Sequence, residues 1–127
     1  MKFTIKLPLP IPSKKNSKQI FVNKATGKPF VTSSASHKAW WSNTILLVKA
    51  EKQRQLDYFT FNGCSIIITF CDNGKREYDL TNKAESIMDI LVDAGIIADD
   101  NRFVVPDLHL KYEYSDKKEC IIEIEGI

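Results

Sequence analysis

The chain has 127 residues and is 43% hydrophobic, which suits one globular domain over residues 1–127 with a single core. No apolar run approaches the roughly 20 residues of a membrane span, and the first residues do not form a signal peptide, so we expect a cytoplasmic protein without a membrane partner. The three cysteines lack a C-x-x-C spacing and indicate neither a disulfide framework nor a zinc knuckle.

The net charge of +2 conceals a segregation of charge along the sequence. Residues 1–50 contain nine lysines and no Asp or Glu, whereas the rest has nine Lys or Arg against all sixteen acids. The two parts therefore carry +9 and −7. Such a basic face is often merely solvated, but it also suits a polyanion, and we expect a basic binding surface beside a separate acidic centre.

The N-terminal residues alternate apolar and polar side chains over positions 2–7, which predicts a half-buried strand. Three prolines in residues 8–13 then require a surface loop, because proline lacks the amide donor that a sheet interior needs. The polar residues that follow are suited to phosphate oxygens. These candidate phosphate-binding residues are Lys14, Lys15, Asn16 and Lys18.

A β-hairpin is predicted next, from two short β-like runs at residues 19–22 and 29–32. Its tip is basic, and we expect Lys24 and Lys28 to belong to the same polyanion-binding surface. A helix over about 35–55 follows, and its two tryptophans begin the apolar stripe. They are therefore expected in the core rather than as a stacking platform for bases.

Residues 62–71 form a run apolar enough to be a central strand. It ends at Asp72, which we expect to shape a turn rather than to bind a metal. Two cations, Lys75 and Arg76, follow this turn. A phosphate held by either of them would lie close to the acids that come next.

A second helix is predicted over about 82–94, where apolar residues recur at the spacing of a buried face. The acids Glu85, Asp89 and Asp93 share the opposite stripe. Carboxylates four residues apart repel each other, and a bound cation would reverse the sign of that interaction. For Asp89 and Asp93, simple solvation is the expected alternative.

Acids also stand at both ends of this helix. Asp79 precedes it, where it could simply favour the helix dipole, and Asp99 and Asp100 follow it. A β-like run at residues 103–105 suggests that one of the later acids begins a strand and points back towards Asp79. Oxygen ligands of this kind suit Mg²⁺, or alternatively Mn²⁺, and predict metal-assisted hydrolysis of a phosphodiester.

The chain closes with two alternating runs, residues 108–114 and 122–127, which we expect to form a C-terminal β-hairpin. His109 falls on the polar side of the first run and is expected to be an ordinary surface residue. Together, these elements predict an α+β domain with a mixed β-sheet and two principal helices.

The segment Arg-Glu-Tyr-Asp-Leu-Thr-Asn at residues 76–82, followed by Asp89 and by Asp-Asp-Asn at 99–101, resembles the RusA family of Holliday-junction resolvases of bacteria and prophages. The similarity extends to residues 12–16 and to the closing strands, and so covers nearly the whole chain. It implies a Mg²⁺-dependent endonuclease of mixed α/β fold that acts as a homodimer on four-way DNA junctions in recombination and repair, in a bacterial or phage-infected cell.

On this resemblance, the catalytic aspartates of the family fall on Asp79 and Asp100, and its asparagine falls on Asn82. Two positions depart from the pattern. The family's second aspartate falls on Thr81, and the lysine expected one turn into the helix falls on Glu85.

We hypothesise that the Glu85 carboxylate replaces the one missing at Thr81. The expected metal ligands are then Asp79, Glu85 and Asp100, with Asp99, Asp89 and Asn82 as secondary candidates. Two alternatives remain: a junction-binding protein that has lost its chemistry, and a structural or interaction protein whose acids are merely solvated.

Overall fold

The computed structural model describes residues 1–13, 18–22, 25–33 and 35–127. These contain six strands and two helices. In chain order they are β1 (Lys2–Pro8), β2 (Lys18–Val22), β3 (Pro29–Ser33), α1 (Ala35–Gln55), β4 (Cys64–Asp72), α2 (Leu80–Asp93), β5 (Asp107–Tyr114) and β6 (Glu119–Gly126).

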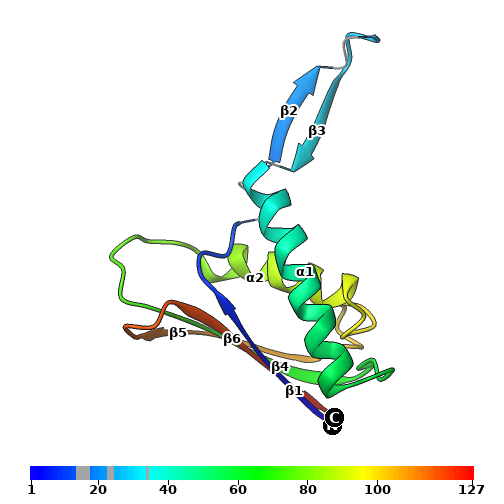
Figure 1. Ribbon diagram of the computed structural model, residues 1–127, viewed down its shortest axis with the longest axis vertical. Helices are drawn as coiled ribbons and strands as arrows, with labels where there is room; N and C mark the ends of the chain where they lie inside the picture. The colour runs from blue at the N-terminus through cyan, green and yellow to red at the C-terminus, as the bar shows by residue number, and fades with distance from the viewer. Residues whose placement is uncertain (14–17, 23–24, 34) are drawn as a thin grey trace.

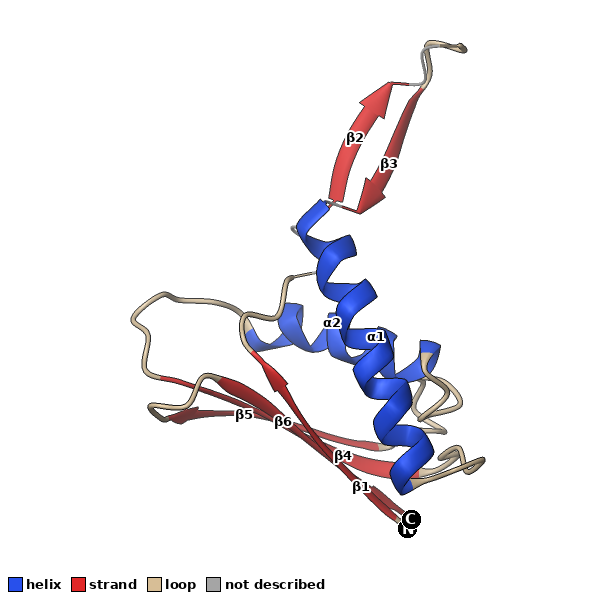
Figure 2. Cartoon of the chain, in the orientation of Figure 1, coloured by secondary structure: helices blue, strands red, loops and turns tan. Residues whose placement is uncertain are grey.

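Four strands form one mixed sheet in the order β1-β6-β4-β5. Strand β6 runs antiparallel to both of its neighbours, whereas β5 runs parallel to β4. Helices α1 and α2 lie on the same face of this sheet, and none of the described elements covers the other face (Figures 1 and 2). The α+β architecture with a mixed sheet and two helices is as predicted.

The period-2 pattern of the sequence sets which strand residues enter the core. In β1, the side chains of Phe3, Ile5 and Leu7 are buried while their neighbours are exposed, so one face of the strand meets the helices. Ile68 of β4 and Ile122 of β6 are opposite one another in the register and are both fully buried. The core therefore lies between the helix layer and one face of the sheet.

The closing strands differ from the predicted hairpin in their pairing. Strands β5 and β6 run in opposite directions and are joined by the short turn at residues 115–118, so the pair is hairpin-like in its connection. However, β4 lies between them and pairs with both. β4 is the most apolar strand and gains two neighbours in this central position, which leaves β5 at the edge.

Helix α2 begins two residues earlier than the sequence predicts, at Leu80, because Asp79 adopts the extended backbone of an N-cap residue. Its predicted apolar face is buried against the sheet. Ser86 is also buried, and its hydroxyl donates a hydrogen bond of 2.7 Å to the carbonyl oxygen of Pro12. This bond ties the helix to the proline-rich loop that follows β1.

Helix α1 has the predicted bounds, and its C-terminal residue Gln55 is tied to β1. The Gln55 side chain donates to the carbonyl oxygen of Thr4 and accepts from the Thr4 amide, at 2.8 and 3.0 Å. These bonds satisfy backbone groups on the open edge of β1. Trp40 and Trp41 are half-buried and pack against the core, as expected.

The β2–β3 hairpin forms as predicted. Phe21 lies opposite Phe30 in its register, and the hairpin projects from the N-terminal end of α1 away from the main sheet (Figure 1). In contrast, residues 103–105 form no strand. They belong to a turn that precedes β5, and the β-like run predicted there is wrong. Among the described helices, none is long and apolar enough to cross a membrane.

Candidate functional site

A groove of about 460 Å³ runs between α2 and the edge strand β5. Its floor is apolar, with Met88 from the helix and Leu108 and Leu110 from the strand. The other lining residues are Thr81, Ala84, Glu85, Asp89 and Asp100. Three of the predicted acids thus line this groove, and we call it the acidic groove.

The local structure explains how acids from distant positions meet there. Glu85 and Asp89 are one helical turn apart on α2 and therefore share a face. Gly95 then ends the helix with a backbone φ of 76°, a conformation that favours glycine. The returning chain is fixed where Ile97 forms a parallel bridge with Phe61, and this places Asp100 beside the helix.

Asp79 lies outside the acidic groove. Its side chain makes no capping bond to the helix backbone, and its Oδ2 accepts a hydrogen bond of 3.2 Å from the Asn82 side chain. Both residues line a second, larger hollow at the N-terminal end of α2. The acidic groove is therefore lined by Glu85, Asp89 and Asp100, whereas Asp79 lines the second hollow.

The oxygens of Asp99 are engaged within its own loop. One accepts from the Asp100 amide at 2.8 Å, and the other accepts from the Asn101 side chain at 3.2 Å. The Asn101 side chain in turn accepts from the amides of Phe103 and Val104. These bonds build the turn at this point, so neither Asp99 nor Asp100 begins a strand as predicted.

Within the described residues, no three His, Cys, Asp or Glu side chains are grouped so as to hold a metal ion by themselves. The closed triad of Asp79, Glu85 and Asp100 is thus not preassembled in the single chain. Mg²⁺ commonly uses only one or two carboxylates and completes its shell with water and substrate phosphate. The oxygen donors of Glu85, Asp89 and Asp100 fit that shared mode, and the metal site remains a prediction.

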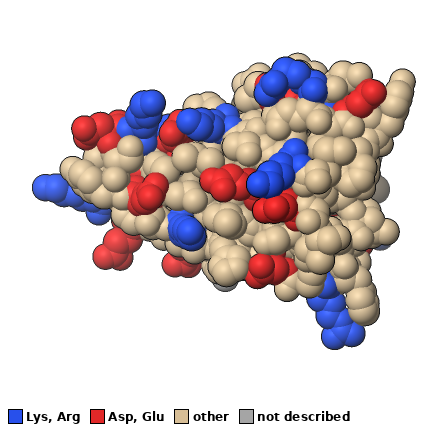
Figure 3. Space-filling view, turned by 90° about the horizontal axis from the view of Figure 1, so that it is seen from below, with Lys and Arg blue, Asp and Glu red and all other residues tan. Residues whose placement is uncertain are grey.

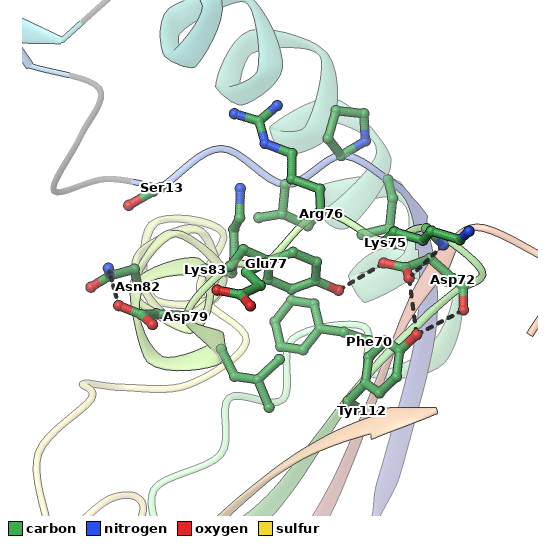
Figure 4. A pocket seen from close by; sticks show the side chains of 16 residues that line it. Ser13, Phe70, Asp72, Lys75, Arg76, Glu77, Asp79, Asn82, Lys83 and Tyr112 are labelled. Carbon is green, nitrogen blue, oxygen red and sulfur yellow. Dashed lines mark hydrogen bonds between the residues drawn. The ribbon is translucent and has the colours of Figure 1, made fainter. Parts of the chain in front are cut away.

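The larger hollow is a cleft of about 980 Å³ beside the N-terminal end of α2 (Figure 4). Its most ordered polar cluster is centred on Asp72. The carboxylate accepts hydrogen bonds from the hydroxyls of Tyr78 and Tyr112, at 2.8 and 3.2 Å, and from the amide of Gly74. Asp72 therefore shapes the turn, as expected, and also anchors two aromatic rings.

Burial and the neighbouring Asp72 carboxylate raise the pKa of the Tyr78 hydroxyl well above its ordinary value. The pKa of Tyr112 is raised for the same two reasons, with desolvation as the larger one and Asp72 as the smaller. A tyrosine of ordinary pKa is already protonated at neutral pH, and the raised pKa values keep both hydroxyls as donors into the alkaline range.

The cleft also holds cations. Lys75 and Arg76 line it, as expected from their position after the turn, and Lys83 joins them from α2. The sequence analysis missed Lys83 and the two tyrosines. The sequence does contain a signal for Lys83. It lies in the first turn of the predicted helix, where the positive end of the helix dipole makes a lysine unfavourable for stability.

Most of the predicted DNA-binding residues of the first half cannot be placed. Lys14, Lys15, Asn16 and Lys24 lie outside the described residues, and Lys18 is described only as part of the backbone of β2. Lys28 is exposed at the base of the hairpin tip. The role of these residues in binding DNA stays a prediction.

The fold brings together charges that the sequence keeps apart. Because β1 pairs with β6, Lys2 lies opposite Glu125, and their side chains are 3.8 Å apart. His109 contacts Asp107 at 2.9 Å on the outer face of the sheet. Lys, Arg, Asp and Glu side chains are interspersed on the face seen in Figure 3. The segregation of charge along the sequence is thus partly cancelled in space.

No model of a known protein family matches the chain, and no curated protein is found to resemble it.

Proposed function

We propose that the protein is a Mg²⁺-dependent endodeoxyribonuclease that resolves Holliday junctions or other branched DNA by phosphodiester hydrolysis. The family resemblance in residues 76–82 and 99–101 suggests the substrate. In this proposal the protein acts as a homodimer, because paired nicks related by a two-fold axis need two matching sites. Mn²⁺ is an alternative ion, since it takes the same oxygen ligands.

The observation that carries the proposal is the meeting of Glu85, Asp89 and Asp100 in one groove. Two of these acids come from the helix and the third from the loop beyond it. Carboxylate oxygens on neighbouring walls of one cleft are ligands of the kind that a divalent cation takes. Their gathering supports a site that is completed by a divalent cation and a DNA phosphate.

The groove also supports the idea that Glu85 stands in for the aspartate missing at Thr81. Both residues line the acidic groove and are one helical turn apart. A carboxylate at either position would thus face the same space. The ion would activate water and neutralise charge on the phosphate, while Glu85 and Asp100 would supply oxygen ligands from opposite walls.

A cleavage assay on a labelled mobile four-way junction tests the proposal. Wild type is expected to make symmetric nicks with Mg²⁺ and none with EDTA, and Asp100→Asn is expected to abolish them. Asp93→Asn is a matched control, because Asp93 is exposed on the same helix and does not line the groove. Absence of Mg²⁺-dependent nicks from wild type would overturn the proposal.

A second function is favoured by a specific observation: Thr81 carries no carboxylate, and no group of three metal-binding side chains is formed in the described part of the chain. The protein would then bind junctions without cutting them. The same assay distinguishes the two functions, since a binding protein would retain junctions equally well in EDTA and in Mg²⁺ and would leave them intact.

A further inference from the structure

Two cations in the cleft have no acidic partner. In the part of the chain that the structure describes, no carboxylate lies within ion-pair distance of Arg76 or Lys83. Both line the cleft, and Figure 4 shows their charged ends on the same side of it, away from the Asp72 cluster. This pairing of like charges distinguishes them from Lys2 and Arg54, which face glutamates.

Lys83 is held in place rather than free in solvent. Its ammonium lies 5.5 Å from the centroid of the Tyr78 ring. That ring is itself fixed by its bond to Asp72 and by edge-to-face contact with Phe70. The ammonium is therefore presented to the cleft from a rigid support.

The surroundings of Lys83 make its charge costly. Partial burial lowers the pKa of Lys83, and the neighbouring positive charge of Arg76 lowers it further. Among the described residues, the contact with the Tyr78 ring is the favourable interaction of this charge, and no ion pair adds to it. An anion between the two groups would replace their repulsion with two charge-assisted hydrogen bonds.

The carboxylates of the cleft leave these cations available. Asp72 is occupied by two tyrosine hydroxyls, and Asp79 accepts from Asn82. In Figure 4 the carboxylates of Glu77 and Asp79 lie below the charged ends of Arg76 and Lys83, and no ion pair joins them within the described residues. The cleft volume of about 980 Å³ leaves ample room for a phosphate group and the sugar attached to it.

We propose that Arg76 and Lys83 together bind one phosphate group of a DNA strand in this cleft. The planar guanidinium offers two parallel donors to phosphate oxygens, and the ammonium acts as a point charge on the same group. The phosphate chemistry follows from the two cations, and the choice of DNA as its source rests on the proposed function. Both the cleft and the acidic groove are lined by residues of the first turns of α2, Lys83 in the cleft and Glu85 in the groove, so a strand held here would pass near the carboxylates.

The test is a titration of the full chain with inorganic phosphate, deoxythymidine 5′-monophosphate and a short single-stranded oligonucleotide, at constant ionic strength set with chloride. Binding is followed by NMR shifts of the Arg76 side-chain Nε–H and of the backbone amides around the cleft. The variants are Arg76→Met and Lys83→Met, which keep the alkyl stem and remove the charge. Lys111→Met is the control, because Lys111 is exposed on the edge strand and does not line the cleft.

Each cleft variant is expected to weaken phosphate binding about tenfold, the effect of losing one charge-assisted hydrogen bond, while the control is unchanged. The oligonucleotide is expected to bind more tightly than inorganic phosphate and to depend on the same residues. Lys83→Arg should retain binding. Arg76 is exposed, so its variant is informative even if Lys83→Met does not fold.

Equal affinities for wild type and Arg76→Met, or an equal loss in Lys111→Met, would overturn the site. Tight binding of inorganic phosphate with no gain for the oligonucleotide would overturn DNA as the source. This outcome is separable from that of the nuclease assay. If phosphate binding depends on Arg76 but wild type makes no Mg²⁺-dependent nicks, the phosphate site stands and the nuclease proposal fails. If wild type makes nicks but phosphate binding does not depend on Arg76, the nuclease proposal stands and the phosphate site fails.

Discussion

Asp72 illustrates how one residue can link three elements. It ends β4, accepts an amide hydrogen bond within its own turn, and holds the hydroxyls of Tyr78 and Tyr112. The sequence predicts the turn from the residues Asp-Asn-Gly. It does not predict the tyrosine bonds, because Tyr112 is brought to Asp72 only by the parallel pairing of β4 with β5.

The raised pKa of Tyr78 predicts how stability changes with pH. Above the ordinary tyrosine pKa of 10.0, Tyr78 in the unfolded chain loses its proton while the folded chain retains it. Loss of this proton stabilises the unfolded state relative to the folded state, so the free energy of unfolding should fall as pH rises above about 10. Replacing Tyr78 with Phe should make this fall shallower.

Urea unfolding between pH 7 and 11 measures the effect of Tyr78→Phe. Tyr114→Phe is the control, because its ring is exposed and lies outside the Asp72 cluster. The same dependence on pH for wild type and Tyr78→Phe would show that the Tyr78 hydroxyl does not carry the linkage.

At the scale of the elements, both helices and most strands follow from periodicity, whereas their arrangement does not. The order of the sheet depends on β4 inserting between β5 and β6, and neighbouring strands in a sequence more often pair directly. The β-like run at residues 103–105 does not become a strand for a local reason. The Asn101 side chain accepts hydrogen bonds from the amides of Phe103 and Val104, which a strand would instead pair with a neighbouring strand. The acidic groove was predictable only in its helical part, where Glu85 and Asp89 share a face.

The central position of β4 predicts a large effect for Ile68→Ala. The side chain is fully buried between the sheet and the helices, and removing it leaves a cavity that its neighbours on two strands cannot fill. We expect the free energy of unfolding to fall by about 2–5 kcal/mol.

Urea unfolding with an unchanged m-value measures this loss. Ile121→Ala is the matched control on the opposite face of the sheet, where the side chain is only half-buried and the loss should be smaller. Equal losses in the two variants would contradict the assignment of the core to the helix-covered face.

At the scale of the whole molecule, charge is distributed differently from its distribution along the sequence. Pairing of β1 with β6 sets Lys2 against Glu125, and Lys75, Arg76 and Lys83 lie in the cleft. The acids of interest lie in the neighbouring groove. In the proposed function, a DNA strand held in the cleft would be cut at the groove; the two hollows lie on different sides of the first turns of α2, and a homodimer would present this arrangement twice.

The central claim, that the acidic groove performs the hydrolysis, is tested most directly by the single-turnover rate of junction cleavage in Glu85→Gln. This change keeps the size of the side chain and removes its charge from the groove. We expect the rate in Mg²⁺ to fall at least about 100-fold, the loss of several kcal/mol expected when metal-assisted stabilisation is weakened, while junction affinity is retained. The Asp93→Asn control should cut at the wild-type rate. An undiminished rate in Glu85→Gln would contradict the account.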